Sequence, residues 1–493
     1  MMKQLRLTFG LLMLGLTTVS LTAQDRHKIE VEIAGFTGSE AYLGYYLADK
    51  TYLLDTAAVE DGKFVFQGDD PLDKGMYLVV FPPENNYFEV VIDKDQTFSV
   101  STSYPEFVKN MKVKGSKENQ VMYDDLHFLD EQRQTAIALQ ADLEGLEEGS
   151  EAHTAISEQL AAISNEVEDY RNNFIAEDPE MLYAKMLTSL KQVDVPESPV
   201  DENGEEIDPS FRFRYYRDHF FDYVDFTDDR LLRTPILFDK VKTYFEKLVM
   251  KHPDSIIAQI DPIIEKAGDN FEVYQNLVVH FTNQYATSKI MGMDAVYVHM
   301  VEQYYMHEEK TPWVDEEQRK KMRDRAYATS KTILGRPAPD FSVKDINGDT
   351  QSVHGIEAEY TLLYFWDYDC GHCKTITPKL SEALKDYSEY DIKLMSVNIN
   401  GDETVWKERV KKYELDQDFM IPTHDAYRTS GFDQLYDIRS TPRLFILDKD
   451  KKIVAKQISV ESMREILDSM LGIERPAEPE SENASEESES AGH

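Results

Sequence analysis

Two cysteines, the only ones in the sequence, lie three residues apart in the segment Cys370-Gly371-His372-Cys373. They follow the apolar run 360–366 and precede a stretch with helical periodicity, which predicts Cys370 at a helix N-terminus and Cys373 one turn inside it. Unsatisfied N–H groups at a helix N-terminus stabilise a thiolate. We therefore expect Cys370 to be the more acidic, more exposed thiol that attacks a disulfide, and Cys373 to be the shielded thiol that resolves the mixed disulfide.

Charged neighbours should tune this pair. His372 offers a donor and a partial positive charge, which favours the thiolate and predicts a more oxidising couple than proline would give at that place. Asp367 and Asp369 act in the opposite direction, because nearby negative charge raises the pKa of a thiol, and Lys374 offsets them in part. The residues alone do not show whether these charges together raise or lower the pKa of the thiol.

A zinc half-site and an inert pair are the alternatives to redox chemistry. A structural zinc ion needs two further ligands, usually Cys or His at ordered spacing. The sequence has no second Cys pair, and the nearest histidines, His354 and His424, are isolated. Redox chemistry is therefore favoured, and neither a metal nor a cofactor is expected.

Thr441-Pro442 directly precedes the apolar run 443–447. A peptide bond before proline can be cis, and a cis bond at the start of a strand is a deliberate feature of a fold. An ordinary trans proline at the start of an edge strand would be favoured if this dipeptide stood alone. Beside the cysteine motif, the cis form is the favoured interpretation.

Residues around these motifs alternate between strand and helix patterns, which predicts an α/β layer. The expected strands are 360–366, 392–398, 443–447 and 452–457. The expected helices are 374–387, 403–413 and 462–471, with a short helical turn at 432–436.

Residues 334–473 resemble the thioredoxin fold, and specifically its TlpA/ResA-like extracytoplasmic branch, which is related to the alkyl hydroperoxide reductase group. The motifs that carry the resemblance are Gly335-Arg336-Pro337-Ala338-Pro339-Asp340-Phe341, Phe365-Trp366, Pro378, Thr441-Pro442 and the stretch 419–437. The resemblance implies that Pro442 is cis and borders the cysteines, and that Thr441 offers its backbone to a substrate chain. It also implies that Trp366 packs beneath the site, and we count Trp366 with Thr441 and Pro442 as substrate-binding residues. The whole layout is similar to multidomain exported proteins of Bacteroidota.

This sequence departs from the family at two positions. Thioredoxins bury an acid six residues before the first cysteine, where this chain has Tyr364. ResA-like proteins carry a glutamate three residues after the second cysteine, where this chain has Ile376. Both acids accept the proton of the resolving thiol in the family, so water or His372 would have to serve here.

The rest of the chain predicts a multidomain protein. Residues such as Ile29, Val31 and Ile33 alternate with charged residues and predict an N-terminal all-β sandwich or barrel. A later apolar seam that includes Ile156 and Leu160 at helical spacing predicts an all-α middle domain that begins with a helical hairpin. The aromatic-rich stretch 211–244 could form a ligand face, but buried helix packing is the favoured interpretation. The expected boundaries are a signal peptide at 1–23, the β domain at 24–115, the helical domain at 116–332, the thioredoxin-like α/β domain at 333–473 and a disordered acidic tail at 474–493.

Charge and the N-terminus indicate the compartment. Lys3 and Arg6 precede a Leu-rich apolar segment at 5–16, and small and polar residues follow up to Ala23, which is the pattern of a cleaved secretory signal. We expect a soluble periplasmic protein. The net charge of −39 argues against nucleic acid and anionic membranes as partners.

The sequence thus predicts an exported thiol-disulfide oxidoreductase that acts on protein thiols and disulfides, with family analogy favouring a reductase or isomerase. An exported enzyme of this kind needs a membrane redox partner. In the alternative, the first two domains bind a glycan, a peptide or a partner protein, and the thioredoxin-like part is a docking or redox-regulated module. The substrate, the direction of electron flow and the oligomeric state stay open.

Overall fold

The computed structural model describes residues 26–475 and divides the chain into two compact units. One unit runs up to residue 248 and includes 266–273, and the other comprises 249–265 and the residues from 274 onward. The predicted helical middle is thus shared between the two units, and the predicted domain boundaries stay a prediction. The expected signal peptide and almost all of the expected acidic tail lie outside the described residues.

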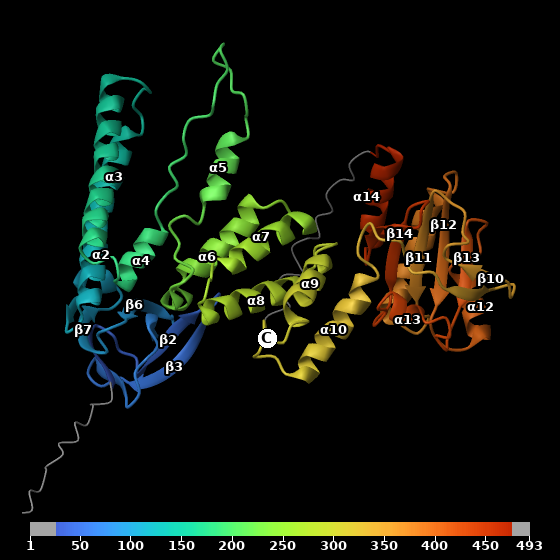
Figure 1. Cartoon of the computed structure of the whole chain (residues 1–493), viewed down its shortest axis with the longest axis horizontal. Helices are drawn as coiled ribbons and strands as arrows, with labels where there is room; N and C mark the ends of the chain where they lie inside the picture. The colour runs from blue at the N-terminus through green and yellow to red at the C-terminus, as the bar shows by residue number, and fades with distance from the viewer. Residues whose placement is uncertain (1–25, 476–493) are drawn as a thin grey trace, which may run out of the picture. The chain divides into compact units, whose positions relative to one another are not determined.

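Two four-stranded sheets form the N-terminal β region, in the orders β4-β1-β7-β8 and β3-β2-β5-β6 (Figure 1). Their cores meet at Phe81, whose ring lies 6.1 Å from that of Phe64 in the other sheet. Ile29, Val31 and Ile33 are buried as their alternation predicts. The all-β expectation is confirmed by these strands: β1 (His27–Ala34), β2 (Glu40–Leu47), β3 (Lys50–Ala58), β4 (Lys63–Gly68), β5 (Gly75–Phe81), β6 (Asn86–Ile92), β7 (Thr97–Ser103) and β8 (Lys112–Lys114).

Helices follow, and the first long pair forms the expected hairpin, with the rings of Phe128 and Tyr170 stacked at 4.3 Å between centroids. The seam of α3 is nevertheless only partly covered, because no residue of that helix is fully buried. Some aromatics of 211–244 pack inside the unit, since Phe220, Phe221 and Tyr244 are buried against one another, whereas Phe213 and Tyr223 are exposed. The elements are α1 (Phe107–Asn110), α2 (Lys117–Leu143), α3 (Glu151–Glu177), α4 (Leu182–Ser189), α5 (Phe211–His219), η1 (Asp229–Arg233), α6 (Ile236–Thr243) and η2 (Tyr244–Leu248).

The second unit begins with a smaller set of helices. Its apolar contacts include Ile260, Ile263 and Val296, all of which are buried. Within residues 26–475, no helix combines the length and the apolar character needed to cross a membrane. The helices of this part are α7 (Pro253–Glu265), α8 (Phe271–Ala286), α9 (Asp294–Met300), η3 (Val301–Tyr305) and α10 (Glu316–Ser330), with the first residues of α8 counted in the other unit.

A seven-stranded mixed sheet in the order β10-β9-β13-β12-β11-β14-β15 completes the second unit (Figure 1). Strands β11, β12 and β13 run parallel, and β14 pairs antiparallel with β11. The strands are β9 (Ser342–Asp345), β10 (Thr350–Ser352), β11 (Tyr360–Trp366), β12 (Ile392–Asn398), β13 (Met420–His424), β14 (Arg443–Leu447) and β15 (Ile453–Lys456). The helices are α11 (Gly371–Lys385), α12 (Glu403–Lys412), α13 (Phe432–Leu435) and α14 (Val460–Leu471), which confirms the predicted α/β layer.

Strand β11 lies in the middle of this sheet and leads to the cysteines. Leu362, Tyr364 and Trp366 enter the core on one face, and Leu363 and Phe365 enter the core on the other. A strand buried on both faces reads as an unbroken apolar run, which is why the sequence shows no polar alternation here. The strand is therefore a rigid support for the loop that follows it.

Candidate active site

The chain leaves β11 through a tight turn that ends at the first cysteine. The N–H of Asp369 donates to the Asp367 carboxylate at 2.8 Å, and the N–H of Cys370 donates to the Asp367 carbonyl at 3.2 Å. Cys370 is the N-cap residue of α11, with extended φ and ψ of −64° and 124°. The turn thus places the sulfur of Cys370 at the helix N-terminus, as the spacing of the motif predicts.

The two thiols differ strongly in environment. Both are free thiols; Cys370 is partly exposed, whereas Cys373 is 1% exposed. Burial works to raise the pKa of Cys370, but the backbone N–H groups of Cys373 and His372 at the helix N-terminus outweigh it, so that its pKa lies below the usual value. Burial raises the pKa of Cys373 to about 12. Near neutral pH, a larger fraction of Cys370 than of Cys373 is therefore ionised, and Cys373 stays protonated.

The loop before β14 closes over the sulfur. The Thr441-Pro442 peptide bond is cis, as expected. The Sγ of Cys370 donates to the Thr441 carbonyl at 3.3 Å. Residues far apart in the sequence meet because Phe365 at the end of β11 pairs with Arg443 at the start of β14.

Other predicted site residues lie as follows. His372 and Asp369 are exposed on the surface around the cysteines. His372 contributes through its backbone N–H, and Thr441 and Pro442 are half-buried beside the sulfur. These positions are compatible with residues that adjust the pKa of a thiol and with residues that border a substrate site.

The expectation that Trp366 binds substrate needs correction. Its side chain is fully buried, with 0% of its surface exposed. It belongs to the same core as Cys373 and meets the ring of Tyr413 at 6.1 Å between centroids. Trp366 therefore supports the cysteines from below and presents no surface to a substrate.

Tyr364 and Thr377 form a buried hydroxyl pair near Cys373, and the sequence did not reveal it. Their oxygens lie 2.9 Å apart, and both side chains are fully buried. Burial raises the pKa of Tyr364, so the phenol stays protonated and cannot accept the proton of Cys373. Thr377 follows Cys373 by four residues on α11, a spacing that places both on one helix face and could have revealed the pair.

Replacing Thr377 by Val should destabilise this domain by about 1–3 kcal/mol, because the Tyr364 hydroxyl is then buried without a partner. Combining Tyr364→Phe with Thr377→Val removes both partners and should recover much of that loss. Urea unfolding of the full chain, followed by the fluorescence of the buried Trp366 and Trp406, measures the effect. If the free energy of unfolding of the double variant falls by as much as the losses of the two single variants added together, the pairing is contradicted.

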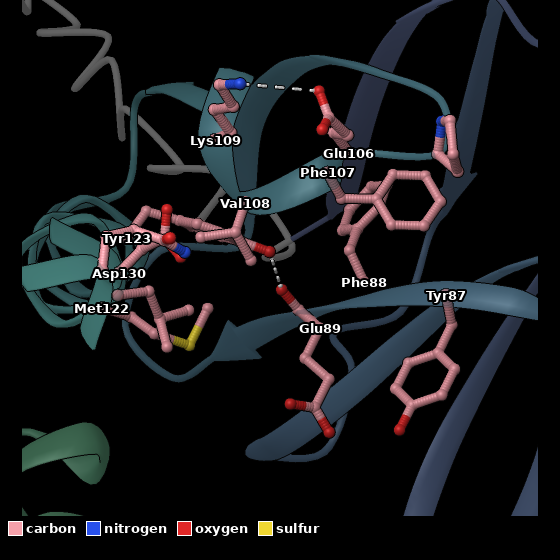
Figure 2. A pocket seen from close by; sticks show the side chains of 13 residues that line it. Tyr87, Phe88, Glu89, Glu106, Phe107, Val108, Lys109, Met122, Tyr123 and Asp130 are labelled. Carbon is pink, nitrogen blue, oxygen red and sulfur yellow. Dashed lines mark hydrogen bonds and ion pairs between the residues drawn. The ribbon is translucent and has the colours of Figure 1, made fainter. Parts of the chain in front are cut away.

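A separate cavity of about 780 Å³ lies in the N-terminal unit, between β6, α1 and α2 (Figure 2). Phe88, Phe107 and Met122 supply apolar lining, and the hydroxyl of Tyr123 donates to the Glu89 carbonyl at 2.7 Å. Three of its charged groups have partners, since Lys109 lies 3.8 Å from Glu106 and the carboxylate of Glu89 accepts from a tyrosine outside the cavity at 2.6 Å. The lining of this cavity is therefore more typical of packing than of a catalytic site. Within residues 26–475, no group of three or more His, Cys, Asp and Glu side chains could hold a metal ion.

Comparison with known families separates the chain into three parts. Residues 334–456 match the AhpC/TSA family. Residues 27–122 match a domain of unknown function, DUF4369, and residues 155–332 match another, DUF5106. The family with a known chemistry is thus the one that contains the cysteines.

Individual relatives and solved structures match parts of the chain. The thiol-disulfide oxidoreductase ResA of Bacillus cereus is 28% identical over 136 residues, which are 28% of this chain and 76% of the relative. A solved domain of a possible thiol-disulfide isomerase from Cytophaga hutchinsonii is 31% identical, and the match covers 28% of this chain and 94% of that domain with a TM-score of 0.27. A thioredoxin-like protein from Bacteroides caccae is 19% identical over 56% of this chain and 98% of its own, with a TM-score of 0.42.

Proposed function

Residues 334–456 form a thioredoxin-like domain of the AhpC/TSA family whose relatives are thiol-disulfide oxidoreductases, and we propose that it exchanges disulfides with exported proteins through Cys370 and Cys373. The observation that carries the proposal is the contrast between the two thiols. One is accessible with a lowered pKa, and the other is buried with a pKa of about 12. A nucleophile and a resolving thiol require this division of roles.

In the reducing direction, the Cys370 thiolate attacks one sulfur of a substrate disulfide. A mixed disulfide forms, and the other substrate sulfur leaves as a thiolate that takes a proton from water. Cys373 then loses its proton and attacks the Sγ of Cys370, which releases the second substrate thiol and leaves a Cys370–Cys373 disulfide. Two electrons have passed to the substrate, and a dithiol donor must return them before the next cycle.

The proton of Cys373 needs an acceptor within the site. The pKa of about 12 means that Cys373 keeps its proton near neutral pH in the reduced site. Tyr364 is excluded as the acceptor because its own proton is retained. Water that reaches the half-buried Cys370, or His372 on the rim, is the proposed route.

Export gives this chemistry its setting. The signal-like pattern of residues 1–23 directs the chain to the periplasm, where disulfides persist. A membrane redox partner would supply electrons to the site there. Reduction or isomerisation of protein disulfides is the proposed net reaction.

Insulin reduction tests the proposal. The full chain from residue 24, supplied with dithiothreitol, should accelerate precipitation of the insulin B chain over dithiothreitol alone. Insulin offers protein disulfides without any dedicated docking to this chain, so acceleration reports the thiol chemistry itself. A rate equal to that of dithiothreitol alone would reject the proposed reaction.

A further inference from the structure

A second cavity, of about 710 Å³, lies inside the second unit, and part of its lining comes from residues close in sequence to the Thr441-Pro442 loop. Its lining includes Arg439 and Arg443, which flank the Thr441-Pro442 loop. The Thr441 carbonyl of that loop accepts the hydrogen bond from Cys370. Arg443 follows Thr441 by two residues, so their Cα atoms are at most about 7 Å apart.

The lining of this basic cavity is positive in a strongly negative chain. Five basic side chains face three acidic ones there, although the whole sequence carries a net charge of −39. The basic residues are Lys289, Arg325, Arg439, Arg443 and Lys456, and the acidic residues are Asp294, Asp437 and Glu465. A positively charged cavity in an otherwise acidic protein creates a local positive electrostatic potential, which attracts anions.

Some of these charges are already neutralised. Lys456 is buried and forms an ion pair with Asp294, and Arg439 lies 2.7 Å from Asp437. The Lys456–Asp294 pair joins β15 to α9, whereas Arg439 and Asp437 belong to one loop, and both pairs leave fewer acids to balance the remaining cations. Glu465 is the third acidic residue of the lining.

Two arginines of the lining have no carboxylate partner within residues 26–475. Arg325 donates to the Ala286 carbonyl at 2.6 Å, and its guanidinium lies 4.5 Å from the centre of the Tyr297 ring. Arg443 donates to the Ser440 hydroxyl at 2.7 Å. Each guanidinium has five N–H donors, so both keep donors available for a carboxylate.

The first turn of α14 also contributes to this wall. Ser459 caps the helix by accepting from the N–H of Ser462, and both residues line the cavity. The partial positive charge of the helix N-terminus is offset by Glu461 in the same turn. The positive character of the wall therefore depends on the two arginines without a carboxylate partner in the described part of the chain.

We propose that this basic cavity selects substrate proteins with an Asp or Glu within about four residues of the cysteine that exchanges with Cys370. A substrate chain that lies against Thr441 continues past Arg443, and an extended chain advances about 3.3–3.6 Å per residue. A carboxylate two to four residues from the substrate cysteine is therefore within range of Arg443, which lines the same cavity as Arg325. The inference rests on the proposed disulfide exchange and names the class of protein substrate for it.

The test uses the full chain and two disulfide-linked fluorogenic peptides that differ only in having Asp or Asn two and four residues from the cysteine. Charge steering acts mainly on association and is screened by salt. We expect kcat/KM for the Asp peptide to exceed that for the Asn peptide by about tenfold at low salt, with the ratio falling towards one at about 0.5 M salt. Equal values at low salt overturn the inference.

Variants on α10 locate the effect. Arg325→Gln should bring the Asp-to-Asn ratio close to one, and Arg325→Lys should keep part of it. Arg323→Gln is the matched control, because Arg323 lies on the same helix, pairs with Glu316 at 2.7 Å and is outside the lining. Comparing the Asp-to-Asn ratio of kcat/KM within each variant removes any effect that the substitution has on the thiol chemistry of both peptides. An unchanged ratio in Arg325→Gln overturns the inference.

Two outcomes separate this inference from the proposed function. If the wild-type chain reduces neither peptide, disulfide exchange itself is rejected. If both peptides are reduced at equal rates, only the charge selection fails. A preference for the Asp peptide that appears only after deletion of the acidic residues 476–493 would mean that this segment occupies the cavity in the full chain. That result would also overturn the selection of acidic substrates.

Discussion

Replacing Cys370 by Ser should lower the rate of insulin reduction to that of dithiothreitol alone, a loss of at least about a thousandfold in the catalysed rate. The hydroxyl of serine is not ionised near neutral pH, and only a thiolate attacks a disulfide at a useful rate. Because Cys370 is partly exposed at a helix N-terminus and serine is close to cysteine in size, the change removes the nucleophile with little change in packing.

The matched variant is Cys373→Ser, which keeps the nucleophile and removes the resolving thiol. It should accumulate a mixed disulfide between Cys370 and the substrate, seen as an adduct by intact mass spectrometry and lost on reduction. Adduct formation by Cys370→Ser would contradict the assignment, because the buried Cys373 would then be the attacking thiol.

Alkylation of the reduced chain at pH 8 should label Cys370 at least about 50 times faster than Cys373. A thiol with a pKa of about 12 is ionised to only about one part in ten thousand at that pH, whereas a thiol with a pKa below 9 is ionised by about a tenth or more. The ionised fractions thus differ by about a thousandfold. The Cys373 thiolate is the more basic one and is therefore the stronger nucleophile. This reduces the expected difference in alkylation rate by about twentyfold.

The pH dependence has a definite sign. The lowered pKa of Cys370 means that its alkylation rate levels off at a lower pH than that of an ordinary thiol, whereas the pKa of about 12 at Cys373 means that its rate still climbs at pH 10. Peptide mapping after timed treatment with iodoacetamide follows both thiols in one sample. In urea the two rates should converge, because the helix N-terminus and the burial are gone. Rates within fivefold of each other in the folded chain would contradict the described site.

Elements with strong burial patterns could be predicted from the sequence. Strand β11 matches its expected range because a strand buried on both faces leaves an uninterrupted apolar run. The cysteine motif was predictable for the same reason, since strand, turn and helix follow one another locally. Strand β3 was missed because nearly all of its side chains are exposed, so it shows no apolar alternation.

Features that depend on tertiary packing were harder to predict. The seam of α3 suggested a covered helix face, but the structure leaves that helix without a fully buried residue. The family resemblance implied that Trp366 packs beneath the site, and it was counted among the substrate-binding residues, yet its position on β11 buries it fully in the core with Cys373. The basic cavity combines α10 with the loop before β14, and no local pattern in the sequence connects Arg325 with Arg443.

The most direct test of the central claim is the reduction potential of the Cys370/Cys373 couple. The full chain from residue 24 would be equilibrated in glutathione buffers and its free thiols trapped and counted. The proposed function predicts a disulfide that forms and breaks reversibly, with a potential between about −270 mV and about −180 mV for a reductase or isomerase. A thiol count that stays at two in every buffer would contradict the redox role and favour the alternative in which this domain serves in binding.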